Sequence, residues 1–516
     1  MDSYTVAELL RKPRTAHRVN ENRVAVVCGD TRLTYDELDE RSDRLAAALA
    51  AEGFVKGERV GVLMYNRVEW PEIFFAVAKL GGVVVPVNYL LKRQEVEFIL
   101  DDCGASWLVF EEGLRSIVPF AGDGASDRRY VGVATGKSEG GVLDYAELME
   151  SGRTAAAPTS AIRADDLFLL QYTSGTTGVP KGAMHSHATV LWNSFHQVVD
   201  YGITSDEVFL VVPALCWAAG FHDIALATLW MGGRVVLSPS TGFEPERFFS
   251  TVERERITSA LLVPTVLKRV LADPAFDRFD LSSLRIICSG GEPVPITAIQ
   301  DARRKLPTCA LLQCYGMSEF PTMMLYLDGP NAERKIGSAG RACSAAEIRI
   351  VDEKGQDTPV GAVGEIICRS PATMLGYYGR PEATASTLVD GWLHTGDLAQ
   401  VDDEGFVYIS GRSKDMIITG GLNVYPAEVE RVIAQHPAVL EAAVVGVEDP
   451  RWGEVGDALV VLAPEAALDE EELVGYLREN LANYKIPRKY SFTRDPLPRT
   501  TSGKVQKFKV RERMSA

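Results

Sequence analysis

Residues 173–182 hold the densest group of side chains in the chain that could bind a charged ligand. They read Thr-Ser-Gly-Thr-Thr-Gly-Val-Pro-Lys-Gly, which places four hydroxyl residues, three glycines and Lys181 within ten positions. Glycines let the backbone approach a ligand closely and hydroxyls donate hydrogen bonds, while the lysine adds positive charge. This combination suits a polyphosphate. It is not a Walker A loop, because Pro180 precedes the lysine and Gly182 follows it.

The elements around this loop can be predicted from the apolar residues. Residues 167–170 form an apolar run that is typical of a buried strand. After the loop, four apolar residues follow at helical spacing: Leu191, Phe195, Val198 and Val199. The loop is therefore predicted to join a strand to a helix. Without its lysine, a polar loop that binds nothing would explain the pattern equally well.

Four later segments combine turns with groups that could bind a nucleotide. Residues 289–293 read Ser-Gly-Gly-Glu-Pro after an expected strand, and open α/β sheets bind ligands at the carboxyl ends of their strands. Residues 313–319 read Gln-Cys-Tyr-Gly-Met-Ser-Glu, and residues 392–397 read Trp-Leu-His-Thr-Gly-Asp. Residues 497–504 end in Ser-Gly-Lys. A carboxylate such as that of Glu319 suits a hard cation beside phosphates, because such cations prefer oxygen ligands.

Length and composition fit a protein of several domains. The 516 residues are too many for one ordinary core, and 46% hydrophobic with 24% charged residues are typical of a globular protein. The net charge of −16 disfavours nucleic acid or an anionic membrane as a partner, and no apolar run approaches the ~20 residues of a membrane span. The eight cysteines include no C-x-x-C pair. Together with an N-terminus that lacks a signal pattern, they predict reduced thiols in a cytoplasmic protein.

The segments described above resemble the motifs of the adenylate-forming (AMP-binding) superfamily, and within it the acyl-CoA synthetases or acid-CoA ligases. The resemblance extends from about Val24 to Lys509, with six motifs in the expected order. It implies an α/β fold in which a large N-terminal domain, residues 1–413, contains stacked α/β subdomains with mostly parallel sheets. A small mobile α+β domain, residues 414–516, would follow. Alternating strand-like and helical runs along the chain agree with stacked α/β units.

The resemblance also implies which residues bind the nucleotide. ATP is expected to contact Thr173, Ser174, Gly175, Thr176, Thr177, Gly178, Gly291, Glu292, Pro293, Gln313, Cys314, Tyr315, Gly316, Met317, Asp397 and Arg412. Asp397 and Arg412 would hold the ribose, because a carboxylate accepts hydrogen bonds from both of its hydroxyls. Two further matches to the family, residues 364–365 and 376–378, are expected to be structural.

Four residues are expected to act on the phosphates: Lys504, Glu319, Ser318 and Lys181. In the family, the lysine at the position of Lys504 bridges the substrate carboxylate and the α-phosphate, where it stabilises charge that develops in the transition state. Glu319 and Thr176 are the expected ligands of Mg²⁺.

Coenzyme A is expected to bind in a second orientation of the small domain. Lys414 lies two residues after Arg412, at the position of the family's hinge. Rotation there would exchange Lys504 for the loop at residues 420–422. The resemblance implies that CoA contacts Gly420, Gly421, Leu422 and Trp452, although a plain turn and a packing tryptophan are equally consistent with these residues. The sequence offers no clear general base for the CoA thiol.

The acyl pocket is where the chain departs from the family. Many acyl-CoA synthetases carry a Pro-x-x-His segment, and here Cys216 replaces the histidine. The stretch has no carboxylate before Asp223, and burying an amine without a partner is costly, so an amino-acid substrate is disfavoured. A bulky hydrophobic acid is expected instead, whether fatty, alicyclic, terpenoid or aryl. The expected pocket residues are Cys216, Trp217, Phe221, Gly290, Gly316, Met317 and Phe320.

The sequence therefore predicts an ATP- and Mg²⁺-dependent acid-CoA ligase that works through an acyl-AMP intermediate. Its partners would be a small-molecule carboxylic acid, ATP and coenzyme A. One alternative is an acyl-AMP ligase that loads a carrier protein. Another is a non-catalytic nucleotide- or acyl-binding relative, which the presence of Lys504, Glu319 and Asp397 argues against. Homodimers are common in such families, but the sequence decides neither the oligomeric state nor the acid.

Overall fold

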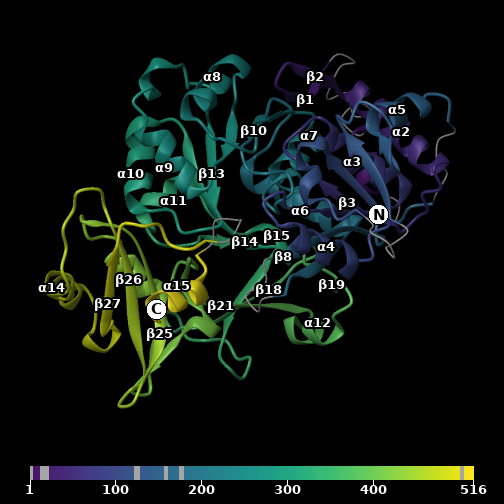
Figure 1. Ribbon diagram of the computed structural model, residues 1–516. Coiled ribbons are helices and arrows are strands. Elements are labelled where there is room, and N and C mark those ends of the chain that lie inside the picture. Colours follow the sequence, from purple (N-terminus) through teal and green to yellow (C-terminus); the bar gives the residue numbers. More distant parts are fainter. Residues whose placement is uncertain are drawn as a thin grey trace. The chain divides into compact units, whose positions relative to one another are not determined.

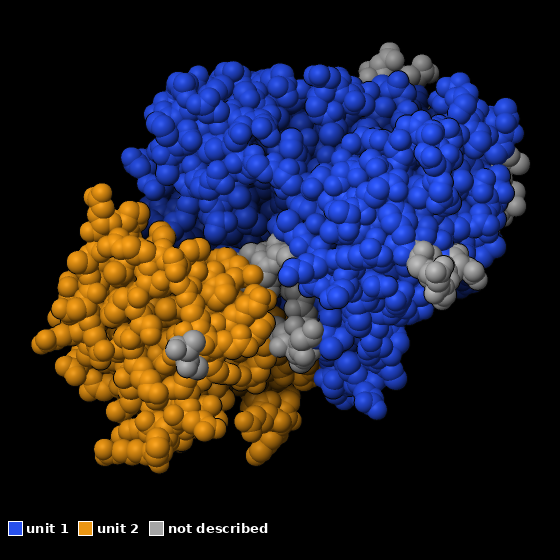
Figure 2. Space-filling model, viewed as in Figure 1, with its two compact units in different colours: residues 1–347, 369–393 blue, residues 348–368, 394–516 orange. Residues whose placement is uncertain are grey.

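The computed structural model describes residues 4–11, 23–120, 128–155, 161–173, 179–499 and 505–515 (Figure 1). These residues form an α/β protein with largely parallel sheets in its N-terminal part and a smaller C-terminal part, which confirms the predicted fold class. The chain divides into two compact units, coloured separately in Figure 2. Unit 1 comprises residues 1–347 and 369–393, and unit 2 comprises residues 348–368 and 394–516.

A nine-stranded sheet of unit 1 has the order β16-β15-β14-β13-β12-β10-β11-β1-β2. Its strands from β14 to β1 are mutually parallel, whereas β2, β15 and β16 pair antiparallel at the two edges. The bounds are β1 Val24–Cys28, β2 Thr31–Thr34, β10 Val208–Val211, β11 Arg234–Leu237, β12 Ser259–Leu261, β13 Ile286–Gly290, β14 Ala310–Met317, β15 Phe320–Leu327 and β16 Arg341–Ala342.

The second sheet of unit 1 has eight strands in the order β19-β9-β8-β4-β3-β5-β6-β7. Its strands from β8 to β7 are parallel, and β9 and β19 add antiparallel strands at one edge. The bounds are β3 Arg59–Leu63, β4 Val83–Pro86, β5 Trp107–Glu111, β6 Arg129–Val133, β7 Val142–Asp144, β8 Leu167–Thr173, β9 Lys181–Ser186 and β19 Gly376–Tyr377.

Helices cover these sheets through their apolar faces. In Figure 1, α9 and α10 lie beside β13, and buried side chains of both helices join Ile287 of that strand in one core cluster. The helices of unit 1 are α2 Tyr35–Ala51, α3 Glu69–Leu80, α4 Arg93–Asp102, α5 Tyr145–Ser151, α6 His187–Tyr201, α7 Leu226–Met231, α8 Pro245–Glu255, α9 Pro264–Ala272, α10 Ile296–Lys305, α11 Gly329–Arg334 and α12 Pro381–Thr387.

The prediction that the loop after β8 leads into a helix is wrong. It leads into β9, which pairs antiparallel with β8 so that Thr173 lies opposite Lys181. Helix α6 begins only at His187, where the Ser186 side chain accepts a hydrogen bond from the Thr189 backbone N–H. The apolar residues correctly indicated the helix, but they did not indicate the short polar strand that precedes it. The loop therefore closes a β-hairpin.

Unit 2 contains most of one five-stranded sheet and all of a second. The first has the order β17-β18-β21-β20 with β22 on β21, and the second has the order β24-β23-β26-β25 with β27 on β26. The bounds are β17 Glu347–Val351, β18 Gly364–Arg369, β20 Leu388–Val389, β21 Trp392–Val401, β22 Val407–Arg412, β23 Ile417–Thr419, β24 Leu422–Val424, β25 Val439–Asp449, β26 Gly453–Leu462, β27 Lys489–Thr493, α13 Pro426–Ile433, α14 Glu470–Asn480 and α15 Lys507–Ser515.

The second sheet of unit 2 buries one face against α13 and α14. Val429 and Ile433 of α13 and Leu473 and Leu477 of α14 are buried in the same cluster as Val460 of β26. Asp469 caps α14 by accepting a hydrogen bond from the Glu472 backbone N–H. These elements match the expected small α+β arrangement. The predicted domain boundary and hinge at Lys414, within the 3₁₀ turn Ser413–Asp415, stay predictions.

Two further properties bear on the sequence analysis. Each of the eight cysteines is a free thiol, and five of them are buried. None of the helices in the described part of the chain has both the length and the apolar character that crossing a bilayer requires.

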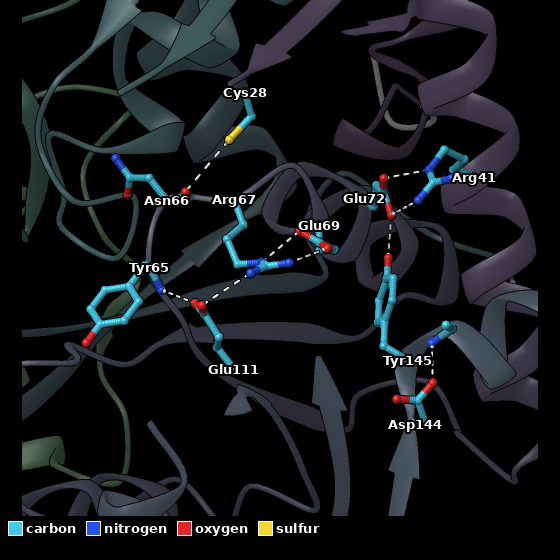
Figure 3. A network of polar contacts seen from close by, with 11 residues as sticks. Cys28, Arg41, Tyr65, Asn66, Arg67, Glu69, Glu72, Glu111, Asp144 and Tyr145 are labelled. Atoms are coloured by element: carbon cyan, nitrogen blue, oxygen red, sulfur yellow. Dashed lines mark hydrogen bonds and ion pairs between the residues drawn. The ribbon is translucent and has the colours of Figure 1, made fainter. Parts of the chain in front are cut away.

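A buried polar network fastens the helices beside the eight-stranded sheet (Figure 3). The Glu72 side chain of α3 is fully buried, and both of its oxygens accept hydrogen bonds from Arg41 of α2 at 2.6 and 3.2 Å. The Tyr145 hydroxyl, at the start of α5, donates to the same carboxylate. Three helices are thus joined through the Glu72 carboxylate. The hydrogen bonds from Arg41 and Tyr145 compensate for the hydration that this carboxylate loses on burial.

Replacing Arg41 by alanine should destabilise the protein strongly, because it leaves the Glu72 carboxylate buried without its cation. We expect the free energy of unfolding to fall by about 3 kcal/mol, at the lower end of the usual cost of breaking a buried ion pair. Arg44→Ala on the same helix removes only a pair with the exposed Glu40 and should cost less than about 1 kcal/mol. Urea unfolding followed by circular dichroism measures both variants. Equal losses would contradict the role given to Glu72.

Candidate active site

In unit 1, the ends of β13 and β14 bring two predicted segments side by side. The strands pair so that Ser289 lies opposite Gln313 and Gly290 lies opposite Cys314. A Cβ atom at Gly290 would lie 2.4 Å from the carbonyl oxygen of Cys314, so only glycine permits this approach. Gly291 then turns the chain with a φ of +85°. Gly290 is therefore required by the packing of the two strands and Gly291 is favoured by the turn, whatever they bind.

Glu319 lies in the tight turn between β14 and β15. Met317 pairs with Phe320, which leaves Ser318 and Glu319 as the turn residues. The Glu319 side chain is 8% exposed, and its Oε1 accepts a hydrogen bond of 2.6 Å from the Tyr377 hydroxyl. The backbone carbonyl of Glu319 accepts a second hydrogen bond, 2.9 Å long, from the Met374 N–H. The direction of this carboxylate is therefore held by residues 374–377.

Tyr377 also contacts the predicted phosphate-binding lysine. The Lys181 Nζ atom lies 4.7 Å from the centre of the Tyr377 ring, a distance typical of a cation–π interaction. Tyr377 is placed there because β19 pairs with β9, with Tyr377 opposite Ala183. From the sequence, residues 376–378 are expected to be structural only. The structure adds that Tyr377 joins Lys181 to Glu319, which no spacing in the sequence indicated.

Part of the expected nucleotide site cannot be compared with the structure. Ser174, Gly175, Thr176, Thr177, Gly178 and Lys504 lie outside the described residues. Thr173 is half-buried at the end of β8, opposite Lys181 at the start of β9. Both ends of the loop are therefore anchored on the hairpin that carries the lysine.

Buried histidines lie close to these turns. His185 of β9 is fully buried, and its Nε2 donates a 2.9 Å hydrogen bond to the Ser318 carbonyl oxygen, since a carbonyl can only accept. Burial lowers the pKa of His185 to about 4 and that of His222 to about 3. Both rings are therefore neutral at neutral pH. His185 positions the backbone that carries Ser318 and Glu319.

The segment expected to line the acyl pocket is held by polar contacts. The buried Asn66, labelled in Figure 3, donates to the carbonyl oxygens of Pro213 and Ser238 at 2.9 and 3.0 Å and accepts from the Leu215 N–H at 2.8 Å. Gln171 Nε2 donates to the Cys216 carbonyl oxygen at 3.3 Å. The sequence did not indicate Asn66, because an isolated asparagine after a strand carries no signal for such a role.

The predicted pocket residues differ in their surroundings. Cys216 is buried, and burial raises the pKa of its thiol to about 12, so Cys216 does not replace the family's histidine as a group that exchanges protons. Phe221 and Phe320 are fully buried, and the Phe221 ring lies 4.9 Å from that of Phe74 in the core. Trp217 is half-buried. Gly290, Gly316 and Met317 are also half-buried, and the acyl role of all seven residues stays a prediction.

Several buried polar atoms in this region have no hydrogen-bond partner in the described structure. They are Gln171 Oε1, Trp217 Nε1, Ser289 Oγ and Gln313 Nε2. Leaving a buried donor or acceptor unpaired costs about 1–3 kcal/mol. Atoms of this kind are explained when water or a bound ligand supplies the missing partner.

In unit 2, the two residues predicted to hold the ribose are brought together. Arg412 Nε lies 2.7 Å from Asp397 Oδ1, and the two residues pair across β21 and β22. The Asp397 backbone N–H donates to the Thr395 hydroxyl oxygen at 3.0 Å. Glu365 accepts from the Gly396 N–H and also contacts His394, which supports its expected structural role.

Unit 2 also brings together the residues predicted to contact coenzyme A. Gly420 and Gly421 form the turn between β23 and β24, both with positive φ, as a tight hairpin requires. A Cβ atom at Gly420 would lie 2.9 Å from the Trp452 ring. The guanidinium groups of Arg451 and Arg488 lie 4.9 and 4.8 Å from the centre of that ring. Arg488 was missed in the sequence because it belongs to no motif.

Two family models together match most of the chain. The family model described as AMP-binding enzyme matches residues 13–378, and the model described as AMP-binding enzyme C-terminal domain matches residues 428–504.

Individual proteins are similar over nearly the whole length. A feruloyl-CoA synthase of Amycolatopsis sp is 42% identical over 497 residues, which cover 96% of this chain and 97% of that protein. An indoleacetate–CoA ligase of Aromatoleum aromaticum is 37% identical, with 93% of each chain covered. The crystal structure of an anthranilate CoA ligase in complex with anthranoyl-AMP matches with a TM-score of 0.87 and 28% identity, covering 100% of this chain and 98% of that one.

Tyr377→Phe should weaken Mg²⁺-dependent binding of ATP, because Glu319 loses the hydroxyl that fixes its direction. A hydrogen bond to a charged group contributes about 1.5–3 kcal/mol, so we expect affinity to fall about tenfold or more. Calorimetric titration with ATP at several Mg²⁺ concentrations measures the effect. Tyr378→Phe, at the next position, should bind ATP like the unmodified protein. An unchanged affinity in Tyr377→Phe would remove Tyr377 from the site.

The buried histidines should make the protein less stable in mild acid. Below a pH of about 6.5, an unfolded histidine binds a proton that buried His185 and His222 do not bind until about pH 4 and pH 3. The free energy of unfolding should therefore decrease as the pH falls from 6.5 to 4, by about 1.4 kcal/mol per pH unit for each such histidine. In His222→Gln, the slope of the unfolding free energy against pH should be smaller by about 1.4 kcal/mol per pH unit, the contribution of one histidine. Urea unfolding measured between pH 6.5 and pH 4 tests this prediction. An identical pH slope in His222→Gln and the unmodified protein would contradict it.

Proposed function

The chain belongs to the AMP-binding enzymes of the adenylate-forming superfamily and is an acyl-CoA synthetase, and on this premise we propose that it joins an aromatic carboxylic acid to coenzyme A in two ATP-dependent half-reactions. The observation that carries the proposal is the similarity to a feruloyl-CoA synthase, at 42% identity over nearly the whole chain. The contact of Tyr377 with both Lys181 and Glu319 supports it.

In the first half-reaction, a carboxylate oxygen of the acid attacks the α-phosphorus of ATP, and pyrophosphate leaves. Lys181, at the base of the β8–β9 hairpin, neutralises phosphate charge together with the hydroxyls of residues 173–177. Ser318 donates a hydrogen bond to the α-phosphate. Lys504 bridges the acid and the α-phosphate and stabilises the charge that develops between them.

The residues present fit a magnesium ion. Glu319 offers a mostly buried carboxylate whose direction is held by the Tyr377 hydroxyl, and oxygen ligands are those that Mg²⁺ prefers. Glu319 and Thr176 would hold the ion. When bound there, Mg²⁺ offsets the negative charge of the phosphates.

In the second half-reaction, the sulfur of coenzyme A attacks the acyl carbon, AMP leaves and the thiol gives up its proton. Trp452, with the guanidinium groups of Arg451 and Arg488 beside it, offers an aromatic and positively charged surface that suits the nucleotide part of CoA. Rotation of the small domain at Lys414 exchanges Lys504 for residues 420–422 between the two steps.

An aromatic acid with a polar substituent is the substrate class that agrees best with the site. The relatives described above are named for ferulate, indoleacetate and anthranilate, each of which is an aromatic acid with a hydrogen-bonding group. Gln171 and Trp217 have buried atoms that lack partners among the described residues, and a phenolic or amino substituent would satisfy such atoms. A plain fatty acid would leave them unpaired.

Pyrophosphate release, measured with ATP and Mg²⁺ across a panel of hydroxycinnamic, indolic, aminobenzoic, alicyclic and fatty acids, tests the proposal. We expect the largest kcat/KM for one of the aromatic acids and a CoA-dependent thioester identified by mass spectrometry. Preference for a fatty acid would overturn the substrate class. Pyrophosphate release without any thioester would point instead to an acyl-AMP ligase that loads a carrier protein.

Lys504→Ala separates the two half-reactions. We expect this variant to lose acyl-AMP formation by at least about 100-fold, which is the usual cost of removing a group that stabilises the transition state. Thioester formation from supplied acyl-AMP and CoA should remain close to that of the unmodified enzyme. Arg499→Ala, in the same segment of the chain, is the control for general damage. An equal loss of both half-reactions would contradict the role proposed for Lys504.

A further inference from the structure

Outside the proposed active site, three side chains in unit 1 bring metal-binding atoms close together. His196 and Asp200 lie one turn apart on α6, and Cys343 follows β16. Their ligand atoms all lie within 4.8 Å of one another. His196 is fully buried and Cys343 is 2% exposed. The cluster combines nitrogen, oxygen and sulfur, which distinguishes it from a group of surface carboxylates.

The hydrogen bonds of His196 leave one ring nitrogen as an acceptor. Asn193 Nδ2 donates to the His222 carbonyl oxygen at 3.0 Å, so the amide oxygen of Asn193 faces His196 Nε2, also at 3.0 Å. An amide oxygen can only accept, so Nε2 carries the hydrogen and Nδ1 of the neutral ring carries a lone pair. This fixed orientation, set by a second residue, is the arrangement found around histidines that bind metals.

The Nδ1 atom faces another acceptor instead of a donor. Asp200 Oδ2 lies 3.7 Å away, too far for a shared hydrogen bond, and Nδ1 is a buried atom without a hydrogen-bond partner in the described parts of the chain. Asp200 is itself held in place, because it accepts hydrogen bonds from the backbone N–H and the hydroxyl of Ser344. Two oriented acceptors that face each other in buried surroundings call for a cation between them.

We propose that His196 Nδ1, Asp200 Oδ2 and Cys343 Sγ bind a divalent transition-metal ion, for which Zn²⁺ is the best match. Zn²⁺ takes this mixture of ligands at about 2.0–2.3 Å, which sets neighbouring ligand atoms of a tetrahedral site about 3.3–3.8 Å apart. His196 Nδ1 and Asp200 Oδ2 lie 3.7 Å apart, slightly more than the about 3.3–3.5 Å expected for a nitrogen and an oxygen on one tetrahedral Zn²⁺, so a small side-chain movement is needed on binding. The three ligand atoms lie within 4.8 Å of one another and must move closer together on binding, and the Cys343 thiol then releases its proton to water.

The fourth position of a tetrahedral ion is left for water. Ser344, which holds the Asp200 carboxylate, is exposed, so the cluster lies just below the surface and an ion can reach it from the solvent. Mg²⁺ does not suit this set, because it prefers oxygen ligands and Cys343 offers sulfur. The proposed ion is therefore distinct from the one assigned to Glu319.

The ion would connect two segments of unit 1 that contact β15, the strand that follows the Ser318–Glu319 turn. The His196 ring lies 6.0 Å from that of Phe320, the residue after Glu319. The Cys343 backbone N–H donates to the Met324 carbonyl oxygen of β15 at 3.1 Å. An ion held by α6 and by the residue after β16 would therefore stabilise the strand that begins beside Glu319. This inference does not depend on the proposed substrate or reaction.

Cobalt titration of the full chain tests the site directly. After treatment with a chelator and a thiol reductant, the protein is titrated with Co²⁺ in the absence of nucleotide. We expect one equivalent to produce the thiolate-to-cobalt absorption band in the near ultraviolet, and one equivalent of Zn²⁺ to remove it. Zn²⁺ alone should raise the midpoint of thermal unfolding by a few degrees. Absence of the band at one equivalent would overturn the proposal.

Three variants assign the band to these residues. Cys343→Ser should abolish the thiolate band, and Asp200→Asn should weaken Co²⁺ binding at least about tenfold. Cys309→Ser, which changes another partly buried thiol, should leave both properties unchanged. A band that persists in Cys343→Ser would refute the site. If Cys343→Ser does not fold, an Asp200→Asn variant that binds Co²⁺ as tightly as the unmodified protein would refute it as well.

Glu319→Gln keeps this test separate from the proposed function. The variant should lose Mg²⁺-dependent activity yet keep the thiolate band with its one-equivalent end point. A band that disappears in Glu319→Gln but persists in Cys343→Ser would show that Co²⁺ binds at the nucleotide site, and this result would overturn the inference.

Discussion

The hydrogen bond from the Tyr377 hydroxyl to the Glu319 carboxylate joins parts of the chain that are far apart in sequence. Glu319 belongs to the turn between β14 and β15 of the nine-stranded sheet, whereas Tyr377 belongs to β19 of the eight-stranded sheet. The same tyrosine ring lies against Lys181. A mostly buried carboxylate needs such a partner, because its lost hydration must be replaced. The contact therefore fixes the position of the Glu319 carboxylate relative to Lys181, the two groups proposed to hold a cation and a phosphate.

Two further sets of polar contacts hold the surroundings of this site. Asn66 ties the end of β3 to the carbonyl oxygens and N–H groups that follow β10, and so connects the two large sheets beside Cys216. The Nε2–H of His185 donates a hydrogen bond to the Ser318 carbonyl oxygen. The cost of burying Asn66 is met by three well-formed hydrogen bonds, whereas His185 contributes one, from its Nε2. The rigid parts of the site thus depend on side chains that do not themselves belong to any motif.

Unit 2 contains a complementary set of groups. Asp397 and Arg412 form a close ion pair across β21 and β22, and Trp452 lies against the glycine turn at Gly420. The first pair is the proposed contact of the ribose, and Trp452 is the proposed contact of the nucleotide part of coenzyme A. In the proposed reaction, the first half-reaction forms the acyl-AMP and the second consumes it. Unit 2 supplies different residues to each step, which is why the hinge assigned to Lys414 matters for the mechanism.

The amino-acid sequence by itself determined the family, the α/β class and the order of the motifs, because glycines, hydroxyls and charged residues at fixed spacing are local properties. It also indicated the helix that contains Leu191. It could not reveal β9, since six residues with a lysine, a glycine and a histidine have no strong strand signal until β8 pairs with them. The roles of Tyr377, Asn66 and Arg488, and the meeting of His196 with Cys343, were decided only by the tertiary structure. Contacts between residues that belong to different strands and helices depend on sheet register and packing, which no local pattern encodes.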